Sequence, residues 1–389
     1  ACLLHDIGHA PMSHIGEFFF DGEEIKQELR TNGIKIETTT PLHEMMSVLI
    51  GITVFKDVLK EYNCDTDLFF RLITGRTLAM EGCSSSKNTP VKEALRSILN
   101  SPFDVDKMDF VLRDSSSAGV PSLELDLERI INSASLVYDR DKLRLAFGKS
   151  GFSVVSTLVD NRNYMFSWIY GHHKVQFHNY VLTRYITKLK EIYPEFRNFF
   201  SYQAVVGNCE IGLPILKKVS YVDDHDLFSI LKNAPFINPE LKIFSEQLFN
   251  RDPYKPLWKT KIEFDEIKKD KFSSKLEYII LHIDSPEFTN EFVMGIDGID
   301  SDDIILFKWS SKVVFPSPIS NPVYFFLDLP GEKRKIKTYE ELFVPGSSGI
   351  PRSQTSTDKI ENQMFYVFIK KEKFTPEIQT RIINKFSSL

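Results

Sequence analysis

The stretch ACLLHDIGHAPMSH at residues 1–14 constrains this chain more than any other, because it places ionisable side chains in an apolar segment. His5, Asp6 and His9 are predicted to lie in an apolar helix, and His14 follows a proline break. Burying imidazoles and a carboxylate among leucine and isoleucine side chains is costly unless the groups are paired. A divalent metal ion and a bound anion would pair them, so the stretch predicts half of a metal site.

The composition is that of an ordinary soluble globular protein. Of 389 residues, 26% are charged and 42% are hydrophobic, and the length predicts two domains, with three as the alternative. The net charge of −5 gives no overall basic field for nucleic acid or an anionic membrane, although a local basic pocket is compatible with it. No apolar run reaches about 18 residues, so no membrane span is predicted. The 4 cysteines are scattered and form no CxxC pair, which favours a reducing, cytoplasmic compartment.

Residues 1–185 are predicted to be mostly helical. The sequence NTP at residues 88–90, followed by VKEALRSIL, combines a cap candidate, a first-turn proline and helical apolar spacing. Residues 153–190 contain few helix breakers and predict long helices. Asp223 and Asp224 precede another segment with the pattern of a capped helix.

The pattern changes near residue 255, where short runs rich in β-branched and aromatic residues begin. The runs KLEYIILHI, DIILFKW, SKVVFPS, NPVYFFLDL and MFYVFIKK are predicted strands, and residues 375–386 form a predicted terminal helix. The polar segments 81–90 and 345–357 are predicted loops. We therefore expect a mainly α fold, with a helical domain over residues 1–255 and a smaller α+β domain over residues 256–389.

A second acidic segment is a candidate for the other half of the metal site. FDVDKMDFVLRDS at residues 103–115 has helical spacing and carries Asp106 and Lys107. Imidazole and carboxylate ligands suit Mg, Mn, Fe, Co or Ni, and Zn is an alternative. A lone His-Asp dipeptide usually binds no metal, and a DxDK segment is usually a solvated helix face. The two segments in one helical region, together with His9 and His14, favour the metal site.

The motifs HDIGHAPMSHIGE and DVDKMDFVLRD resemble the paired motifs of the HD-domain deoxynucleoside triphosphate triphosphohydrolases. PLHEMMS, RNYMFSWIYGHHKV, YVDDHDLFSIL and FNRDPYKPLWK resemble further segments of this family and follow in the family order. The resemblance spans about residues 1–260 and implies an HD-domain helical core. The C-terminal tail is similar to that of the vertebrate member, but with less specificity.

The resemblance implies a role for each residue that falls on a family motif. The metal-ligand positions are His5, Asp6 and Asp106, and the family's fourth ligand histidine and a phosphate-binding arginine are expected upstream of Ala1. The other positions are His14 and Glu17 for proton transfer, His9 and His43 for phosphate contact and support of the site, Lys107 and Arg162 for phosphate, Tyr170 for sugar or base, His172 at the family spacing from Tyr170, Asp114 for the 3′-hydroxyl, and Phe110 under the sugar.

One position departs from the family pattern. The family usually has tyrosine where this chain has Phe110. The ring can still exclude a 2′-hydroxyl by size, but the phenolic hydrogen bond is lost. The stringency of selection for deoxyribose over ribose is therefore in doubt.

Ordinary structural roles remain alternatives for several of these residues. His43 would be a loop cap, Arg162 a surface ion-pair residue, and His172 and its neighbour His173 plain helix residues. The basic run at residues 333–337 is interpreted as a solvated loop, although similar regions of multimeric family members lie near nucleotide-binding interfaces.

The implied reaction is hydrolysis of a dNTP to a deoxynucleoside and inorganic triphosphate, with a divalent metal cofactor. The implied assembly is a homo-oligomer (a dimer, tetramer or hexamer), with an activating nucleotide as a further partner at the subunit interface. Two alternatives stay open. The first is an HD phosphohydrolase that acts on another nucleotide or on single-stranded nucleic acid, although the net charge disfavours a nucleic-acid partner. The second is a catalytically dead nucleotide-binding regulator.

Overall fold

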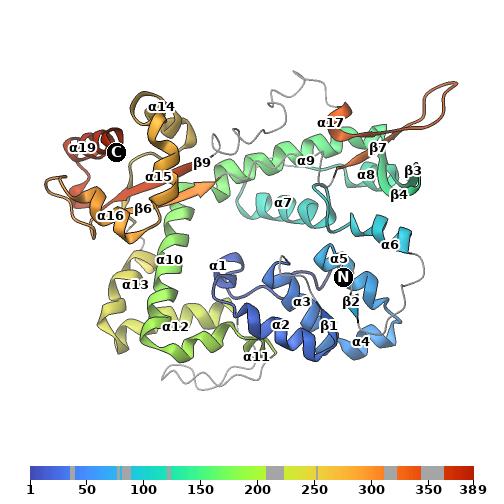
Figure 1. The fold of residues 1–389 in the computed structure, drawn as a ribbon, viewed down its shortest axis with the longest axis horizontal. Helices are drawn as coiled ribbons and strands as arrows, with labels where there is room; N and C mark the ends of the chain where they lie inside the picture. The colour runs from blue at the N-terminus through green and yellow to red at the C-terminus, as the bar shows by residue number, and fades with distance from the viewer. Residues whose placement is uncertain are drawn as a thin grey trace. The chain divides into compact units, whose positions relative to one another are not determined.

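The computed structural model describes residues 1–35, 40–76, 79–80, 89–120, 124–206, 223–250, 253–310, 322–342 and 363–389 (Figure 1). Helices dominate these residues, and their strands form three small sheets. The predicted mainly α fold with a smaller α+β part is confirmed. Within these residues, no helix is both long and apolar enough to span a bilayer.

Backbone contacts divide the chain into two compact units that interleave along the sequence. The first unit comprises Ala1–Asn161, Thr183–Ser245 and Phe315–Ser347. The second comprises Arg162–Leu182, Glu246–Val314 and Ser348–Leu389. The two contiguous domains expected from the sequence, residues 1–255 and 256–389, stay a prediction.

Five helices of the first unit begin where an aspartate supplies a cap. The carboxylates of Asp21, Asp65, Asp104, Asp126 and Asp223 accept hydrogen bonds from backbone N–H groups that a helix start leaves unpaired. The helices of this unit are α1 (His14–Glu17), α2 (Gly22–Thr31), α3 (Leu42–Thr53), α4 (Lys56–Glu61), α5 (Thr66–Thr74), α6 (Thr89–Arg96), α7 (Val105–Ser117), α8 (Leu127–Ser133), α11 (Tyr202–Val205), α12 (Asp224–Ile237) and α17 (Tyr339–Leu342). Three more, α9 (Phe152–Tyr164), α10 (His173–Ile192) and α13 (Lys242–Phe249), continue from one unit into the other.

The first unit also contains a four-stranded sheet that the sequence analysis missed. Its order is β3-β4-β7-β8, with β3 (Ala134–Asp139) and β4 (Lys142–Gly148) forming a hairpin. Arg140 in the turn has a φ of 54°, as a two-residue hairpin turn requires. The other strands are β7 (Tyr324–Leu327), which pairs in parallel with β4, and β8 (Lys335–Thr338), while β1 (Ile34–Lys35) and β2 (Ala79–Met80) form a separate pair.

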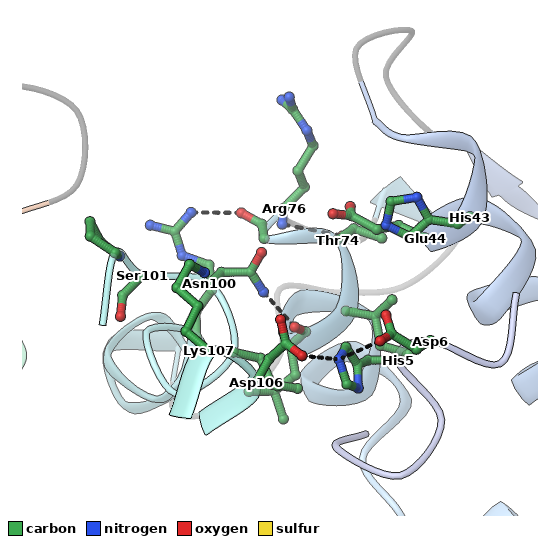
Figure 2. A pocket seen from close by; sticks show the side chains of 16 residues that line it. His5, Asp6, His43, Glu44, Thr74, Arg76, Asn100, Ser101, Asp106 and Lys107 are labelled. Atoms are coloured by element: carbon green, nitrogen blue, oxygen red, sulfur yellow. Dashed lines mark hydrogen bonds and ion pairs between the residues drawn. The ribbon is translucent and has the colours of Figure 1, made fainter. Parts of the chain in front are cut away.

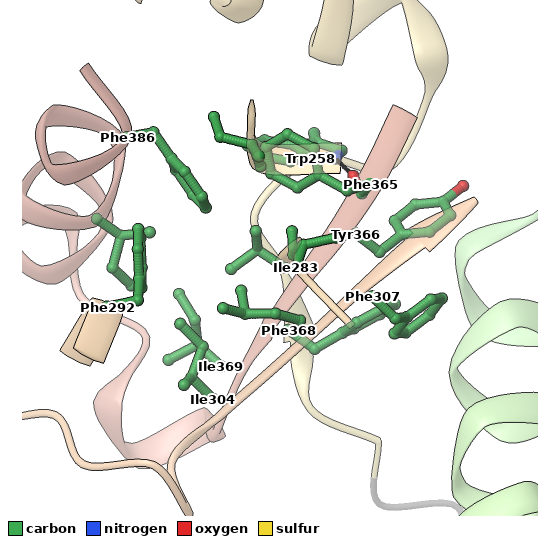
Figure 3. Packing of buried hydrophobic residues seen from close by; sticks show 14 of the residues in the cluster. Trp258, Ile283, Phe292, Ile304, Phe307, Phe365, Tyr366, Phe368, Ile369 and Phe386 are labelled. Carbon is green, nitrogen blue, oxygen red and sulfur yellow. Dashed lines mark hydrogen bonds between the residues drawn. The ribbon is translucent and has the colours of Figure 1, made fainter. Parts of the chain in front are cut away.

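The second unit is built around the buried strand β9 (Gln363–Ile369). This strand pairs in antiparallel fashion with β6 (Ile304–Ser310) on one side and β5 (Lys255–Pro256) on the other. Figure 3 shows the aromatic core over this sheet, where Trp258 donates from Nε1 to the Phe365 carbonyl at 2.7 Å. The helices around it are α14 (Lys261–Lys271), α15 (Leu276–His282), α16 (Pro286–Val293) and α19 (Pro376–Ser388).

One predicted strand is wrong. KLEYIILHI forms helix α15 instead, and its buried residues are Leu276, Ile279, Ile280 and Ile283. This spacing of three and four is that of one helix face. The run was assigned to a strand from its β-branched and aromatic content, and the periodicity that decides the structure was overlooked.

Most other predicted elements are confirmed. They are α6 beginning at Thr89, the long helices α9 and α10, α12 with a capping box from Asp223, strands β6, β7 and β9, and the terminal helix α19. The predicted strand at 311–317, the loop at 345–357 and residues 81–88 of the other loop lie outside the described residues.

Candidate metal and phosphate site

The His-Asp segment of the first unit is a series of tight turns, and not the predicted helix. Its backbone hydrogen bonds span three residues, as from His9 N to Asp6 O, and α1 is its only helical turn. The expected burial is also wrong for Leu3, which is 97% exposed. Successive side chains diverge by about 100° on an α-helix. The turn conformation instead lets His5 and Asp6 face one point.

Helix α3 holds this turn segment through the Ser47 hydroxyl. Ser47 Oγ donates to the His5 carbonyl at 2.6 Å and accepts from the Gly8 N–H at 2.8 Å. Gly8 permits the close approach, because a Cβ atom there would lie 2.3 Å from the His43 carbonyl oxygen and 2.3 Å from the Ser47 nitrogen. The glycine in HDIGH is therefore a packing requirement.

His5, Asp6 and Asp106 converge as predicted metal ligands should (Figure 2). His5 Nε2 lies 3.4 Å from Asp6 Oδ2 and 3.2 Å from Asp106 Oδ1. One donor atom from each of the three residues lies within 4.8 Å of the other two. Adjacent ligands around an ion with bonds of about 2.1 Å are separated by about 3.0–3.5 Å, so these spacings fit a metal ion.

The surroundings of His5 also fit a metal ligand. Its Nδ1 pairs with the Cys2 carbonyl at 2.8 Å, which leaves Nε2 facing the carboxylates, where it is buried without a hydrogen bond. The Asp106 carboxylate, opposed by burial, raises the pKa of His5 to about 9. The two carboxylates favour a proton on His5, and they would favour a divalent cation for the same electrostatic reason. Binding of that cation would displace the proton.

Asp104 is a further residue of this site that the sequence analysis did not single out. It caps α7, and its buried carboxylate accepts from Lys107 N at 2.9 Å and from Lys107 Nζ at 2.6 Å. Burial raises the pKa of Asp104, and the Lys107 charge partly offsets this. The pair fixes the Lys107 ammonium group beside the metal ligands. Asp104 could have been found from the sequence, because it is an aspartate at a predicted helix start, three residues before Lys107.

The four predicted catalytic residues form a second cluster around the Glu17 carboxylate. His14 Nδ1 lies 3.0 Å from Glu17 Oε1, His43 Nδ1 lies 2.7 Å from Oε2, and His9 Nδ1 also pairs with Oε1. On its other side, His9 Nε2 lies 3.3 Å from Asp6 Oδ1. The cluster therefore connects a candidate metal ligand to His14, whose side chain is 80% exposed.

Charge is unevenly distributed in this cluster. Burial alone would raise the pKa of Glu17, yet hydrogen bonds from His14, His43 and His9 hold it well below its usual range. For His9, burial has the opposite effect and would lower the pKa, but the neighbouring Asp6 and Glu17 raise the pKa of His9 to about 9. Glu17 is therefore ionised and His9 protonated near neutral pH. Such a cluster can stabilise negative charge and pass protons.

A cavity of about 570 Å³ opens beside the metal ligands (Figure 2). Lys107, Arg76 and Arg96 line it as cations, and Arg96 Nη1 donates to the Gly75 carbonyl at 2.6 Å. Glu44 also lines it, and burial raises the pKa of this carboxyl to about 7. Neither arginine was predicted in this role, because both stand outside the motifs, and Glu44 was given no role although the motif PLHEMMS contains it.

Phe110 and Asp114 follow Asp106 at intervals of four along α7, so the three residues share one helix face. Phe110 is half-buried and packs against the apolar cluster that includes Phe103 and Val111. Neither Phe110 nor Asp114 lines the cavity. Their contacts with a sugar stay predictions.

Arg162, Tyr170 and His172 belong to the second unit. The Arg162 guanidinium lies 4.7 Å from the centre of the Phe166 ring. Tyr170 ends a π-helix at Met165–Tyr170, and its carbonyl accepts from Gln176 Nε2 at 2.6 Å. Burial lowers the pKa of His172. Their contacts with substrate stay predictions.

Comparison with known proteins gives distant relatives. No family model matches the chain. An uncharacterized protein of Mycoplasma pneumoniae is 24% identical over 282 residues, which cover 70% of this chain and 60% of that protein. A protein of Acanthamoeba polyphaga mimivirus that is named for an HD domain is 27% identical over 194 residues, or 50% of this chain and 37% of that protein. The chain thus spans less than two thirds of the length of these relatives.

A solved structure of a hypothetical protein from Aquifex aeolicus shares the fold, with a TM-score of 0.56 and 16% identity over 98% of this chain and 78% of that one. One of these sequence relatives is named for an HD domain, and the clustered His, Asp and Glu side chains of this chain could hold a metal ion.

Proposed function

We propose that this chain forms the catalytic core of a metal-dependent phosphohydrolase that converts a dNTP and water into a deoxynucleoside and inorganic triphosphate. The convergence of His5, Asp6 and Asp106 beside a cavity that Lys107 also lines carries the proposal. The choice of a dNTP rests on the motif resemblance. The cavity cations Arg76 and Arg96 are compatible with it, because they suit a polyanion.

The metal-ligand residues and Lys107 would act on the substrate phosphate in different ways. His5, Asp6 and Asp106 would hold a divalent ion, which supplies Lewis-acid polarisation of the phosphate and a more acidic water. Lys107, held in place by the buried Asp104, neutralises phosphate oxygens. Because its position is fixed beforehand, it needs no reorganisation as negative charge develops.

His14 is the proposed acid for the leaving 5′ oxygen. Its Nδ1 pairs with Glu17, which leaves Nε2 available for substrate. As the bond from the water oxygen to the α-phosphorus forms, the bond from that phosphorus to the 5′ oxygen breaks. The His14 proton goes to the 5′ oxygen, and the water proton returns to the Glu17 cluster. Proton transfer of this kind contributes about 10²–10⁴-fold to a rate.

The test is product identity. Each dNTP is incubated with the protein and Mg²⁺ or Mn²⁺, and the products are separated by ion-exchange chromatography. We expect a deoxynucleoside and triphosphate in equal amounts. Pyrophosphate or a deoxynucleoside monophosphate as product would overturn the triphosphohydrolase reaction and leave the broader phosphohydrolase class.

Two variants and a control test the residue roles. Asp106→Ala should lose both bound metal and activity, and His14→Gln should keep the metal while kcat falls by about 10²–10⁴-fold. Asp109→Ala is the matched control, because Asp109 lies exposed on the same helix and pairs with Arg113 at 2.8 Å. Full activity in Asp106→Ala would overturn the metal site.

A further inference from the structure

A second cavity, of about 550 Å³, lies in the first unit and shares no lining residue with the cavity of the metal site. Its walls come from β1, α3, α4 and α5. Ligand cavities in proteins typically measure about 300–1,000 Å³, and most have apolar walls with a few placed polar groups. This cavity has the size and the composition of such a site.

Its floor is apolar. Ile34, Val48, Phe69 and Phe70 line it and are almost fully buried. They come from a strand and two helices that are far apart in sequence, so the floor depends on tertiary packing and not on one local segment. Such a surface takes an alkyl or aryl group, because burying apolar area is worth about 25 cal/mol per Å².

Its rim is cationic. Lys56 and Lys60 lie one turn apart on α4, so their side chains share a helix face, and both line the cavity. Among the described lining residues there is no aspartate or glutamate, and no carboxylate of a described residue forms an ion pair with either lysine. The described lining contains no arginine either, which disfavours the forked recognition typical of phosphate groups.

We propose that this cavity binds a small amphipathic carboxylate, with its apolar chain on the Val48 and Phe69 floor and its head group at Lys56 and Lys60. Charge complementarity selects the head group, and an apolar floor within a cavity of about 550 Å³ suits one free molecule better than a membrane surface. The proposal stands independently of the reaction proposed above, because its test measures binding and not hydrolysis.

Cys64 provides the measurement. It lines the cavity, is exposed and forms no disulfide. In a variant that keeps Cys64 as its single cysteine, the rate of thiol modification by a maleimide is followed with and without dodecanoate, below its micellar concentration. We expect dodecanoate to slow modification by about fivefold at four times its Kd, and to raise the thermal midpoint. Octanoate should protect at higher concentrations.

Matched probes and variants make the test decisive. Dodecyltrimethylammonium carries the same chain with the opposite charge and should not protect. The double variant Lys56→Glu/Lys60→Glu should lose protection, whereas Lys142→Glu/Lys149→Glu, which changes exposed lysines of the same unit outside the cavity, should keep it.

Three results would overturn the proposal. They are equal protection by the cationic amphiphile, full protection in Lys56→Glu/Lys60→Glu, and no protection by dodecanoate. If dodecyl phosphate protects Cys64 at lower concentrations than dodecanoate does, the head group of the ligand would be assigned as a phosphate and not as a carboxylate. The variant Ile52→Trp fills the cavity from a half-buried position and should abolish protection without any change of charge.

Discussion

Glu17 illustrates how one side chain can organise several others. An ionised carboxylate has two oxygens and about four acceptor positions, so it can accept from His9, His14 and His43 at once. The His9 and His43 rings stack with centroids 4.3 Å apart, which fixes their orientation. The imidazoles are thereby held in defined orientations around Glu17, as proton transfer at a phosphate requires.

The stability of the metal-free protein should fall as pH rises from 6.5 to about 9. His5 and His9 have pKa values raised from 6.5 to about 9, so the folded state retains protons that the unfolded state has released. Their contribution is complete below pH 6.5 and is lost as pH passes 9. Glu17 has a lowered pKa, so its contribution is present above pH 4.5 and is lost in acid.

Urea unfolding of chelator-treated protein across this pH range checks the expectation. His9→Gln should flatten the decline above pH 6.5, and saturation with Mn²⁺ should remove the part that belongs to His5. Stability that increases between pH 6.5 and 9 would contradict the assigned charges.

Gly8→Ala should destabilise the first unit by about 1–3 kcal/mol and weaken metal binding, because the added Cβ would overlap backbone atoms of α3. Gly22→Ala is the control. A Cβ at Gly22 would lie 3.2 Å from a flexible leucine side-chain atom, and the expected change is below about 1 kcal/mol. Denaturant midpoints and a Mn²⁺ titration measure both effects. Equal effects of the two substitutions would contradict this packing argument.

At this scale the sequence predicted the convergence of His5, Asp6 and Asp106, because a recognisable motif carries each of them. It did not predict Asp104, Ser47 or Glu44. Ser47 acts through hydrogen bonds to backbone atoms about 40 positions away, and Glu44 acts through burial. Neither property is encoded in local spacing.

At the scale of elements, periodicity was a better guide than composition. Helix α15 contains isoleucine and tyrosine, which favour strands. It is nevertheless helical, and its buried residues recur at intervals of three and four positions, as one face of a helix requires. The β3-β4 hairpin was missed for a related reason. Its alternating leucines lie between helices, and β4 gains a parallel partner, β7, only from residues far along the chain.

A pair of substitutions on α15 tests this assignment. Ile279 is buried and Leu281 is 72% exposed, although in a strand they would share one face. Ile279→Asp should cost about 3 kcal/mol or more, and Leu281→Asp should change stability by less than about 1 kcal/mol. Urea unfolding of the second unit measures both. Equal losses would indicate a strand.

At the scale of the molecule, the candidate metal ligands and the Glu17 cluster all lie in the first unit. The second unit contributes Arg162, Tyr170 and His172, which the motif resemblance assigns to substrate. The interleaving of the units could not be predicted from the sequence. Three of the boundaries, at residues 161–162, 182–183 and 245–246, fall inside helices α9, α10 and α13, where a helical pattern runs on without a break.

Metal binding should therefore protect one unit and not the other. Hydrogen exchange with and without Mn²⁺ should slow at residues 5–9 and at the start of α7, because ligand binding suppresses local opening. Residues of β9 should exchange at unchanged rates. The variant Asp106→Ala is the control and should show no metal-dependent protection. Uniform slowing across β9 would contradict a site confined to the first unit.

The π-helix between α9 and α10 has a consequence for how related sequences should align. The Gly171 N–H bonds to the Phe166 carbonyl, five residues back, so this turn holds one residue more than an α-helical turn. Deleting one residue from Met165–Tyr170 would restore an α-helical turn and would rotate the remaining side chains of this segment, up to its end before Gly171, by about 100° around its axis. Homologues with a regular α-helical turn here should therefore carry a single-residue gap at this position, with Arg162 and Tyr170 on different relative faces.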